Sequence, residues 1–182
     1  NELFTAYSFQ ATKIITTVDG GALVCKYKKD YKRAKLLRWY GMDRNKDFID
    51  GDITEAGYKY HMNDVTAVMG IAQLRDLDKF KKYREKLQIC YFENLEGALV
   101  ISGTPYLIYT ANRDKLRKEL FKHGIETGLV HRRNDLYSIF GGKRQDLSGM
   151  DWAEDSYLFL PCHNKMSLKD VKYICSIVNK YD

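Results

Sequence analysis

The stretch that decides the fold runs from residue 4 to residue 24 and reads FTAYSFQATKIITTVDGGALV. Two short apolar runs, AYSFQ and ALVCK, predict strands, and Asp19-Gly20-Gly21 between them is a turn signal. Lys13 stands among small and β-branched residues ahead of that turn. Apolar neighbours would lower its pKa, and a neutral lysine amine can form a Schiff base with an aldehyde. A lysine whose stem lies on apolar surface while its amine stays in water explains the same residues.

Downstream of this stretch, the sequence predicts a helix and then a long irregular connection over residues 26–61, because charged and aromatic residues there alternate with glycines. Residues 63–95 predict one or two long helices, which Asn63 can cap. Their apolar residues recur at steps of three, four or seven, from Val65 to Leu95. This apolar stripe predicts that the helices pack against a core along their whole length. It also predicts that they connect two domains.

The last part of the chain predicts a small α/β layer unit. A turn at 102–105 precedes a strand (106–111), a helix (113–122), further strands (126–131 and 157–162) and a final helix. Asn112 is a plausible cap, and Gly124 stands where a left-handed residue ends a helix, with Ile125 as its hydrophobic contact. Ser167 and Asp170 have the spacing of a capping box.

Composition excludes several classes of protein. The 182 residues are 45% hydrophobic and 30% charged, which is typical of a folded chain, and no apolar run of about 18 residues predicts a membrane helix. The N-terminal residues carry no signal-peptide pattern. The net charge of +6 comes from scattered basic runs, so nucleic-acid binding is not favoured. Four cysteines without metal-site spacing predict free thiols in the cytoplasm and no metal site.

Four blocks in order resemble the DegT/StrS family of pyridoxal-phosphate (PLP) dependent sugar aminotransferases. The block around Lys13 is similar to that family's lysine motif, roughly SFxxxKxxxxxEGG. The second block, GYKYHMNDVTAVMGIAQLRDLD at 57–78, is similar to GYxYxMxxxxAAxGxxQLxxLD. GIETGLVHRRNDLY at 124–137 and LFLPCHNKMSLKDVKYI at 158–174 resemble the C-terminal blocks.

The resemblance implies an α/β fold of the aspartate-aminotransferase type, known as fold type I. Residues 1–92 would be the C-terminal part of the PLP-binding large domain with a connecting helix, and residues 93–182 the small C-terminal α/β domain. The family's chain before the lysine supplies a phosphate turn, a ring-stacking aromatic and an aspartate for the pyridine nitrogen. A missing N-terminal half or a complementary chain would supply these, and a homodimer is implied because the site borrows residues from both subunits.

On the cofactor side, Lys13 matches the lysine that carries PLP and shuttles protons. Ser8 matches the serine that holds the cofactor phosphate. Lys59 matches a position that reaches the neighbouring subunit's cofactor phosphate. Two departures stand out: Asp19 replaces the glutamate of EGG, and His61 stands where the family often has arginine, which would make any salt bridge there pH-dependent.

On the substrate side, His131 matches a histidine that faces the active site, and Arg132 and Tyr137 follow it in a loop suited to sugar or phosphate groups. The implied reaction moves an amino group from glutamate to a nucleotide-linked 4-keto-6-deoxy sugar. Two alternatives stay open. A dehydratase of the same family, dependent on the amine form of the cofactor, carries histidine in place of Lys13, and a non-catalytic remnant or split subunit would need a second chain.

Overall fold

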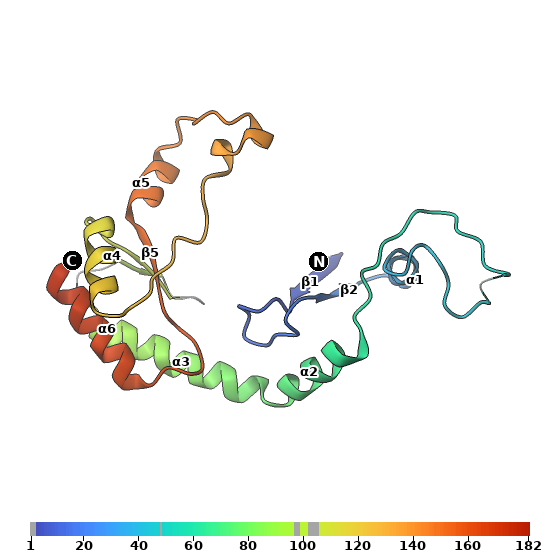
Figure 1. Ribbon diagram of the computed structural model, residues 1–182, viewed down its shortest axis with the longest axis horizontal. Helices are drawn as coiled ribbons and strands as arrows, with labels where there is room; N and C mark the ends of the chain where they lie inside the picture. Colours follow the sequence, from blue (N-terminus) through green and yellow to red (C-terminus); the bar gives the residue numbers. More distant parts are fainter. Residues whose placement is uncertain (1–2, 48, 97–98, 102–105) are drawn as a thin grey trace. The chain divides into compact units, whose positions relative to one another are not determined.

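The computed structural model describes residues 3–47, 49–96, 99–101 and 106–182 (Figure 1). The turn predicted at 102–105 lies outside them. The chain divides into two compact units, residues 1–79 and residues 80–182. Among the described residues, no helix is both long enough and apolar enough to cross a bilayer.

The first unit begins with the two predicted strands. Strands β1 (Phe4–Ser8) and β2 (Gly21–Cys25) pair antiparallel, with Phe4 opposite Cys25 and Ser8 opposite Gly21. A side chain at Gly21 would overlap the carbonyl oxygen of Tyr7, so close strand approach requires glycine here. The connection between the strands carries Lys13.

Helix α1 (Lys28–Leu37) and an irregular segment follow, as the sequence predicts. The irregular segment returns to the end of α1, because the Tyr58 N–H donates to the Leu37 oxygen (2.7 Å) and the Tyr60 N–H to the Arg38 oxygen (3.0 Å). An isolated antiparallel bridge between Trp39 and Lys59 results. This return fixes the backbone position of Lys59.

The long helical region consists of α2 (Asp64–Arg75) and α3 (Leu77–Asn94), which are separated at Asp76. Asn63 caps α2 as predicted, since its side chain accepts a hydrogen bond from the Thr66 N–H (3.0 Å).

Core packing holds for only part of the predicted stripe. Leu87 and Tyr91 of α3 are fully buried, whereas Val65 and Val68 of α2 are 74% and 65% exposed. The expectation of a core along α2 is therefore wrong within this chain. The physical reason is that the first unit has hardly any interior: among residues 3–47 and 49–79, only Thr17 and Gly41 are buried.

The second unit has a core between a sheet and three helices. Strands β3 (Leu99–Ile101), β4 (Tyr106–Tyr109) and β5 (Tyr157–Leu160) are antiparallel in the order β3-β4-β5. Alternate residues of β4 and β5 are buried, as expected when one sheet face packs on helices. The core also includes residues of α3, of α4 (Arg113–Lys122) and of α6 (Leu168–Tyr181). In Figure 1, α4 and α6 lie side by side, in agreement with their contacts.

Between α4 and β5 the chain makes an excursion that carries two short 3-10 helices, η1 (Asn134–Leu136) and η2 (Ser138–Phe140), and helix α5 (Ser148–Ser156) (Figure 1). The strand predicted at 126–131 is reduced to one bridge between Gly128 and Phe159, because the chain then leaves the sheet edge. Gly124 has the predicted left-handed backbone (φ 74°). Asn112 occupies the predicted cap position of α4 but makes no side-chain capping bond.

Replacing Ser167 with alanine should lower the free energy of unfolding by about 1 kcal/mol, because α6 loses its cap. The predicted capping box is confirmed: the Ser167 hydroxyl accepts from the Asp170 N–H (3.2 Å), and the Asp170 carboxylate accepts from the Ser167 N–H (2.7 Å). Chemical denaturation measures the loss. Ser148→Ala, at an exposed helix start without a side-chain cap, is the control, and equal losses in the two variants would contradict the role of the box.

Candidate functional site

Residues 9–20 form a closed loop, called here the lysine loop. The Phe9 N–H donates to the Gly20 oxygen (2.9 Å), and the Phe9 oxygen accepts from the Thr17 N–H (2.9 Å) and the Thr16 hydroxyl (3.0 Å). The Lys13 backbone N–H donates to the backbone oxygen of Gln10 (3.0 Å), and this hydrogen bond closes a turn within the loop. Lys13 is thus held by its backbone.

The surroundings of the Lys13 side chain differ from the expectation. Lys13 is exposed, and so are Ala11 and Thr12 beside it, since the loop turns outward at this point. In the described part of the chain, its amine has no hydrogen-bond or ion-pair partner. The apolar surroundings predicted from the sequence are therefore not provided by the residues that the structure describes.

Helix α2 supports the lysine loop through Gln73. The Gln73 side-chain oxygen accepts from the Thr16 N–H (3.0 Å), and its nitrogen donates to the Thr16 oxygen (2.5 Å). Thr17 is 1% exposed, and a Cβ at Gly70 would come within 3.0 Å of its methyl group. Sequence reasoning assigned no role to Gly70 or Gln73. The sequence did contain a signal for this contact. Gly70 interrupts a helical pattern, and Gln73 follows three residues later on the same helix face.

The turn that follows the loop has an unusual backbone. Val18 has φ 72°, a conformation that β-branched residues rarely adopt, and Gly20 has φ 110°. Side chains hold this turn: the Thr16 hydroxyl accepts from the Val18 N–H (2.9 Å), and the Asp19 carboxylate accepts from the Gly20 N–H (2.8 Å). Asp19 therefore stabilises the turn locally.

Lys59 and the Asp19–Gly21 turn line one cavity of about 520 Å³. Lys59 is exposed, and its position follows from the bridge to Trp39. Ser8 lies at the end of β1 opposite Gly21, and its exposed hydroxyl is 3.4 Å from the Gln10 N–H. Lys59 thus lies beside the Asp19–Gly21 turn, whereas Ser8 ends β1 and Lys13 lies on the lysine loop.

His61 lines the same cavity and contacts Trp39 edge-on, with 4.1 Å between the ring centroids. Burial lowers the pKa of His61, and the positive charges of Lys59, Arg44 and Arg38 lower it further. Its Nδ1 is buried without a partner among the described residues. The lowered pKa favours the neutral form of His61, and the described residues hold no salt bridge to it.

The three substrate-side residues lie together in the second unit. His131, Arg132 and Tyr137 line a cavity of about 570 Å³. The Arg132 guanidinium lies 5.4 Å from the Tyr137 ring centroid, a cation–π contact, and the Tyr157 hydroxyl donates to the His131 oxygen (2.6 Å). All three side chains are exposed, so they are available to a ligand.

In the described ranges, no three histidine, cysteine, aspartate or glutamate side chains are grouped so that they could hold a metal ion. All four cysteines are free thiols, as the sequence predicts.

Comparison with known proteins identifies sugar aminotransferases among the relatives of this chain. Residues 2–179 match the model of the DegT/DnrJ/EryC1/StrS aminotransferase family. A UDP-4-amino-4,6-dideoxy-N-acetyl-beta-L-altrosamine transaminase of Campylobacter jejuni is 31% identical, over 92% of this chain and 49% of that protein. The sugar aminotransferase CalS13 of Micromonospora echinospora superposes with a TM-score of 0.88 at 26% identity, over 97% of this chain and 52% of that one.

A putative sugar aminotransferase of Streptococcus pneumoniae, solved in its PLP form, has the same fold, with a TM-score of 0.83 at 22% identity over 98% of this chain and 51% of that one. The chain spans about half the length of the curated relatives it matches.

Proposed function

Because the chain belongs to the DegT/DnrJ/EryC1/StrS aminotransferase family, we propose that it is the C-terminal half of a PLP-dependent nucleotide-sugar aminotransferase. The match over residues 2–179, with Lys13 in the lysine block, is the observation that carries the proposal. The family is PLP-dependent.

The residues of the first unit fit PLP. An aldehyde needs an accessible amine, and Lys13 is exposed on a loop whose backbone is fixed from both ends and from α2. A phosphate needs hydroxyl, backbone N–H or cationic groups. Ser8 offers an exposed hydroxyl to the phosphate, and Lys59 offers a point charge to the cofactor phosphate of a neighbouring subunit. When bound, PLP supplies an electron sink that stabilises negative charge on the reacting carbon.

The residues of this chain would then move protons and orient substrates. The Lys13 Nζ accepts the proton from Cα of glutamate and, in the reverse direction, delivers a proton to C4 of the sugar. Proton transfer by a positioned group contributes about 10²–10⁴-fold to the rate. Arg132 offers a cation to the diphosphate of a nucleotide-linked 4-keto-6-deoxy sugar, while His131 and Tyr137 offer hydrogen bonds to its hydroxyl groups.

The first unit requires further polypeptide around it. Large apolar side chains on β1, β2 and α2 are half or more exposed, among them Phe4, Tyr7, Leu23 and Val65. Large apolar side chains that are exposed on several elements of one unit indicate surfaces that other polypeptide covers in the folded protein. We infer that the family's N-terminal half, on the same chain or on a complementary one, and a second subunit cover these faces.

Two other functions are less well supported. A dehydratase of the family carries histidine at the position of Lys13, and this chain has lysine. A non-catalytic remnant would need no order in the lysine loop, yet Gln73 holds it through two hydrogen bonds. Assay of the complete protein with glutamate, PLP and a UDP-linked 4-keto-6-deoxy sugar separates these functions, since only the aminotransferase forms an amino sugar. The free thiols favour a cytoplasmic location for it.

Lys59→Ala should weaken PLP retention roughly tenfold without unfolding the protein, as loss of a charged contact to a phosphate does. The family resemblance assigns this contact to the cofactor of the neighbouring subunit. Absorbance of the cofactor during dialysis measures its retention, and Lys46→Ala, an exposed lysine on the same connection, is the control. Unchanged retention in Lys59→Ala would remove Lys59 from the cofactor site.

A further inference from the structure

Two adjacent arginines in the second unit have opposite environments. Arg132 is exposed and lies over the Tyr137 ring, whereas Arg133 is 2% exposed. Burial of a guanidinium is costly unless hydrogen bonds and opposite charges compensate it. The partners of Arg133 therefore indicate what it does.

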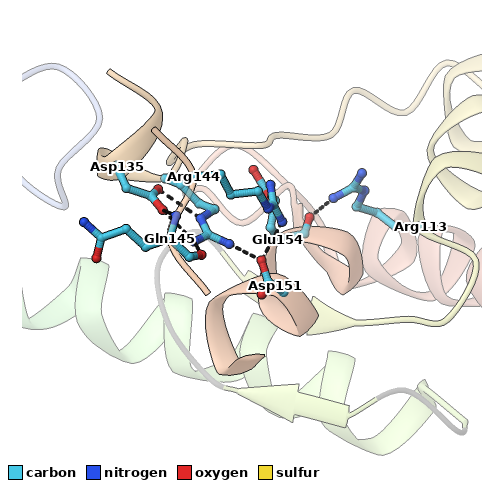
Figure 2. Close-up of polar contacts among 7 residues, drawn as sticks. Arg113, Asp135, Arg144, Gln145, Asp151 and Glu154 are labelled. Carbon is cyan, nitrogen blue, oxygen red and sulfur yellow. Dashed lines mark hydrogen bonds and ion pairs between the residues drawn. The ribbon is translucent and has the colours of Figure 1, made fainter. Parts of the chain in front are cut away.

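Arg133 joins three parts of the excursion between α4 and β5. Its Nε and Nη2 donate to the two carboxylate oxygens of Asp135 (3.0 and 2.6 Å), which makes a bidentate pair. Nη2 also donates to the backbone oxygen of Gln145 (2.8 Å). Its Nη1 pairs with Asp151 of α5. Figure 2 shows Asp135, Gln145 and Asp151 with the dashed polar contacts of this region. We call Arg133, Asp135, Gln145 and Asp151 the arginine brace.

The brace is connected to the rest of the second unit. The Asp135 carboxylate also accepts from the Gln145 N–H (2.9 Å), so residues 135 and 145 are tied directly. Arg113 of α4 donates to the backbone oxygen of Glu154 in α5, which links the excursion to a helix of the core (Figure 2). Through these contacts, the position of the excursion is set relative to α4.

Little apolar packing holds the excursion: Trp152 of α5 stacks on Tyr109 of β4 with 4.6 Å between the ring centroids, but Trp152 is still 54% exposed. None of residues 134–155 is buried, and the large apolar side chains Ile139 and Phe140 are 84% and 62% exposed. Segments with few buried apolar contacts open easily unless other interactions order them. The brace supplies the buried interaction that the excursion otherwise lacks.

The brace keeps its charges at neutral pH. Hydrogen bonds from Arg133 and from the Gln145 N–H lower the pKa of Asp135 to about 2. The hydrogen bond to Asp135 raises the pKa of Arg133, although burial opposes it. Burial alone would raise the pKa of Asp151, but hydrogen bonds from Arg144 and Arg133 outweigh it and lower the pKa. Groups that stay ionised near pH 7 do not exchange protons with a substrate there, so the brace is suited to positioning.

We propose that Arg133 is a positioning residue, which through Asp135, Gln145 and Asp151 holds the excursion so that Arg132 and Tyr137 face the nucleotide sugar. The brace and the substrate-side residues share the same cavity wall, since Arg133 and Asp135 line the cavity of about 570 Å³ with them. The role in substrate binding rests on the proposed function. The ordering of the excursion rests on the contacts of Arg133 alone.

The test compares Arg133→Gln and Arg133→Lys in the complete protein with PLP, glutamate and UDP-4-amino-4,6-dideoxy-N-acetyl-beta-L-altrosamine as probes. The two half-reactions are followed separately by cofactor absorbance. Arg133→Gln should raise KM for the UDP-sugar about ten- to a hundredfold, because a misplacement of about 1 Å can cost on the order of 10²-fold. The glutamate half-reaction should change less than about twofold. Arg133→Lys should lie between, since a point charge cannot make the bidentate pair.

Hydrogen exchange gives a second readout that needs no turnover. Amides of residues 134–150 should lose protection in Arg133→Gln, while those of β4 and α6 keep it. Lys143→Gln is the matched control, because Lys143 is an exposed cation on the same excursion with no ion pair among the described residues, and it should leave KM and protection near wild type.

An unchanged KM in Arg133→Gln, or an equal loss in both half-reactions, would overturn the positioning role. Unchanged protection of residues 134–150 would overturn the brace itself. A wild-type protein that turned over no nucleotide sugar would contradict the proposed function instead, and the exchange measurement would still decide whether Arg133 orders the excursion.

Discussion

Lys13→Ala should lower the rate of amino transfer in the complete protein by about 10²–10⁴-fold or more, with little change in stability. The rate falls because the amine that moves protons at the substrate carbon is lost. Stability is kept because Lys13 is exposed and its backbone, which the substitution retains, makes the turn contact with Gln10. Formation of the amino sugar under single-turnover conditions measures the effect.

The matched control is Lys28→Ala, an exposed lysine at the start of α1 in the same unit. Its rate should stay within about twofold of wild type, as for a surface charge outside the site. A Lys13→Ala protein that transferred amino groups at the wild-type rate would contradict the assignment, whatever the control did.

An aspartate at Leu87 should destabilise the protein by several kcal/mol, roughly 3–5, because it would place an unpaired charge in the core of the second unit. Leu87 of α3 is fully buried in a cluster with residues of β4, β5, α4 and α6. The same change at Ile89, which lies on α3 but is 54% exposed, should cost less than about 1 kcal/mol. Denaturant unfolding of both variants measures the difference.

Leu77, which the sequence places on the same stripe, is only half-buried, so an aspartate there should have an intermediate effect. Equal stability of the Leu87 and Ile89 variants would show that the interior of the second unit is not formed as described. A loss of activity in Leu87→Asp without a loss of stability would point to a different role for α3.

Features determined by neighbouring residues could be predicted from the sequence. The capping box of Ser167 and Asp170, the left-handed Gly124 and the cap of α2 by Asn63 all depend on contacts within three or four residues. The strands on either side of Asp19-Gly20-Gly21 were predictable for the same reason, since the glycines mark the turn.

Features determined by distant partners could not be predicted in this way. Gln73 is hydrogen-bonded to Thr16, which lies 57 residues away in the sequence, and the identity of residue 73 alone does not indicate this partner. Arg132 and Arg133 are identical neighbours, yet only the second meets Asp151 and is buried. The exposure of Val65 was missed because an apolar helix face predicts burial but does not say which polypeptide provides it.

The most direct test of the account is borohydride reduction of the complete protein loaded with PLP, followed by peptide mapping with mass spectrometry. Reduction fixes the cofactor to the lysine that holds it. We expect one labelled peptide, which contains Lys13, and no label on the same peptide in Lys13→Ala. Label on any other lysine, Lys59 included, or a protein that binds PLP without any reducible attachment, would contradict it.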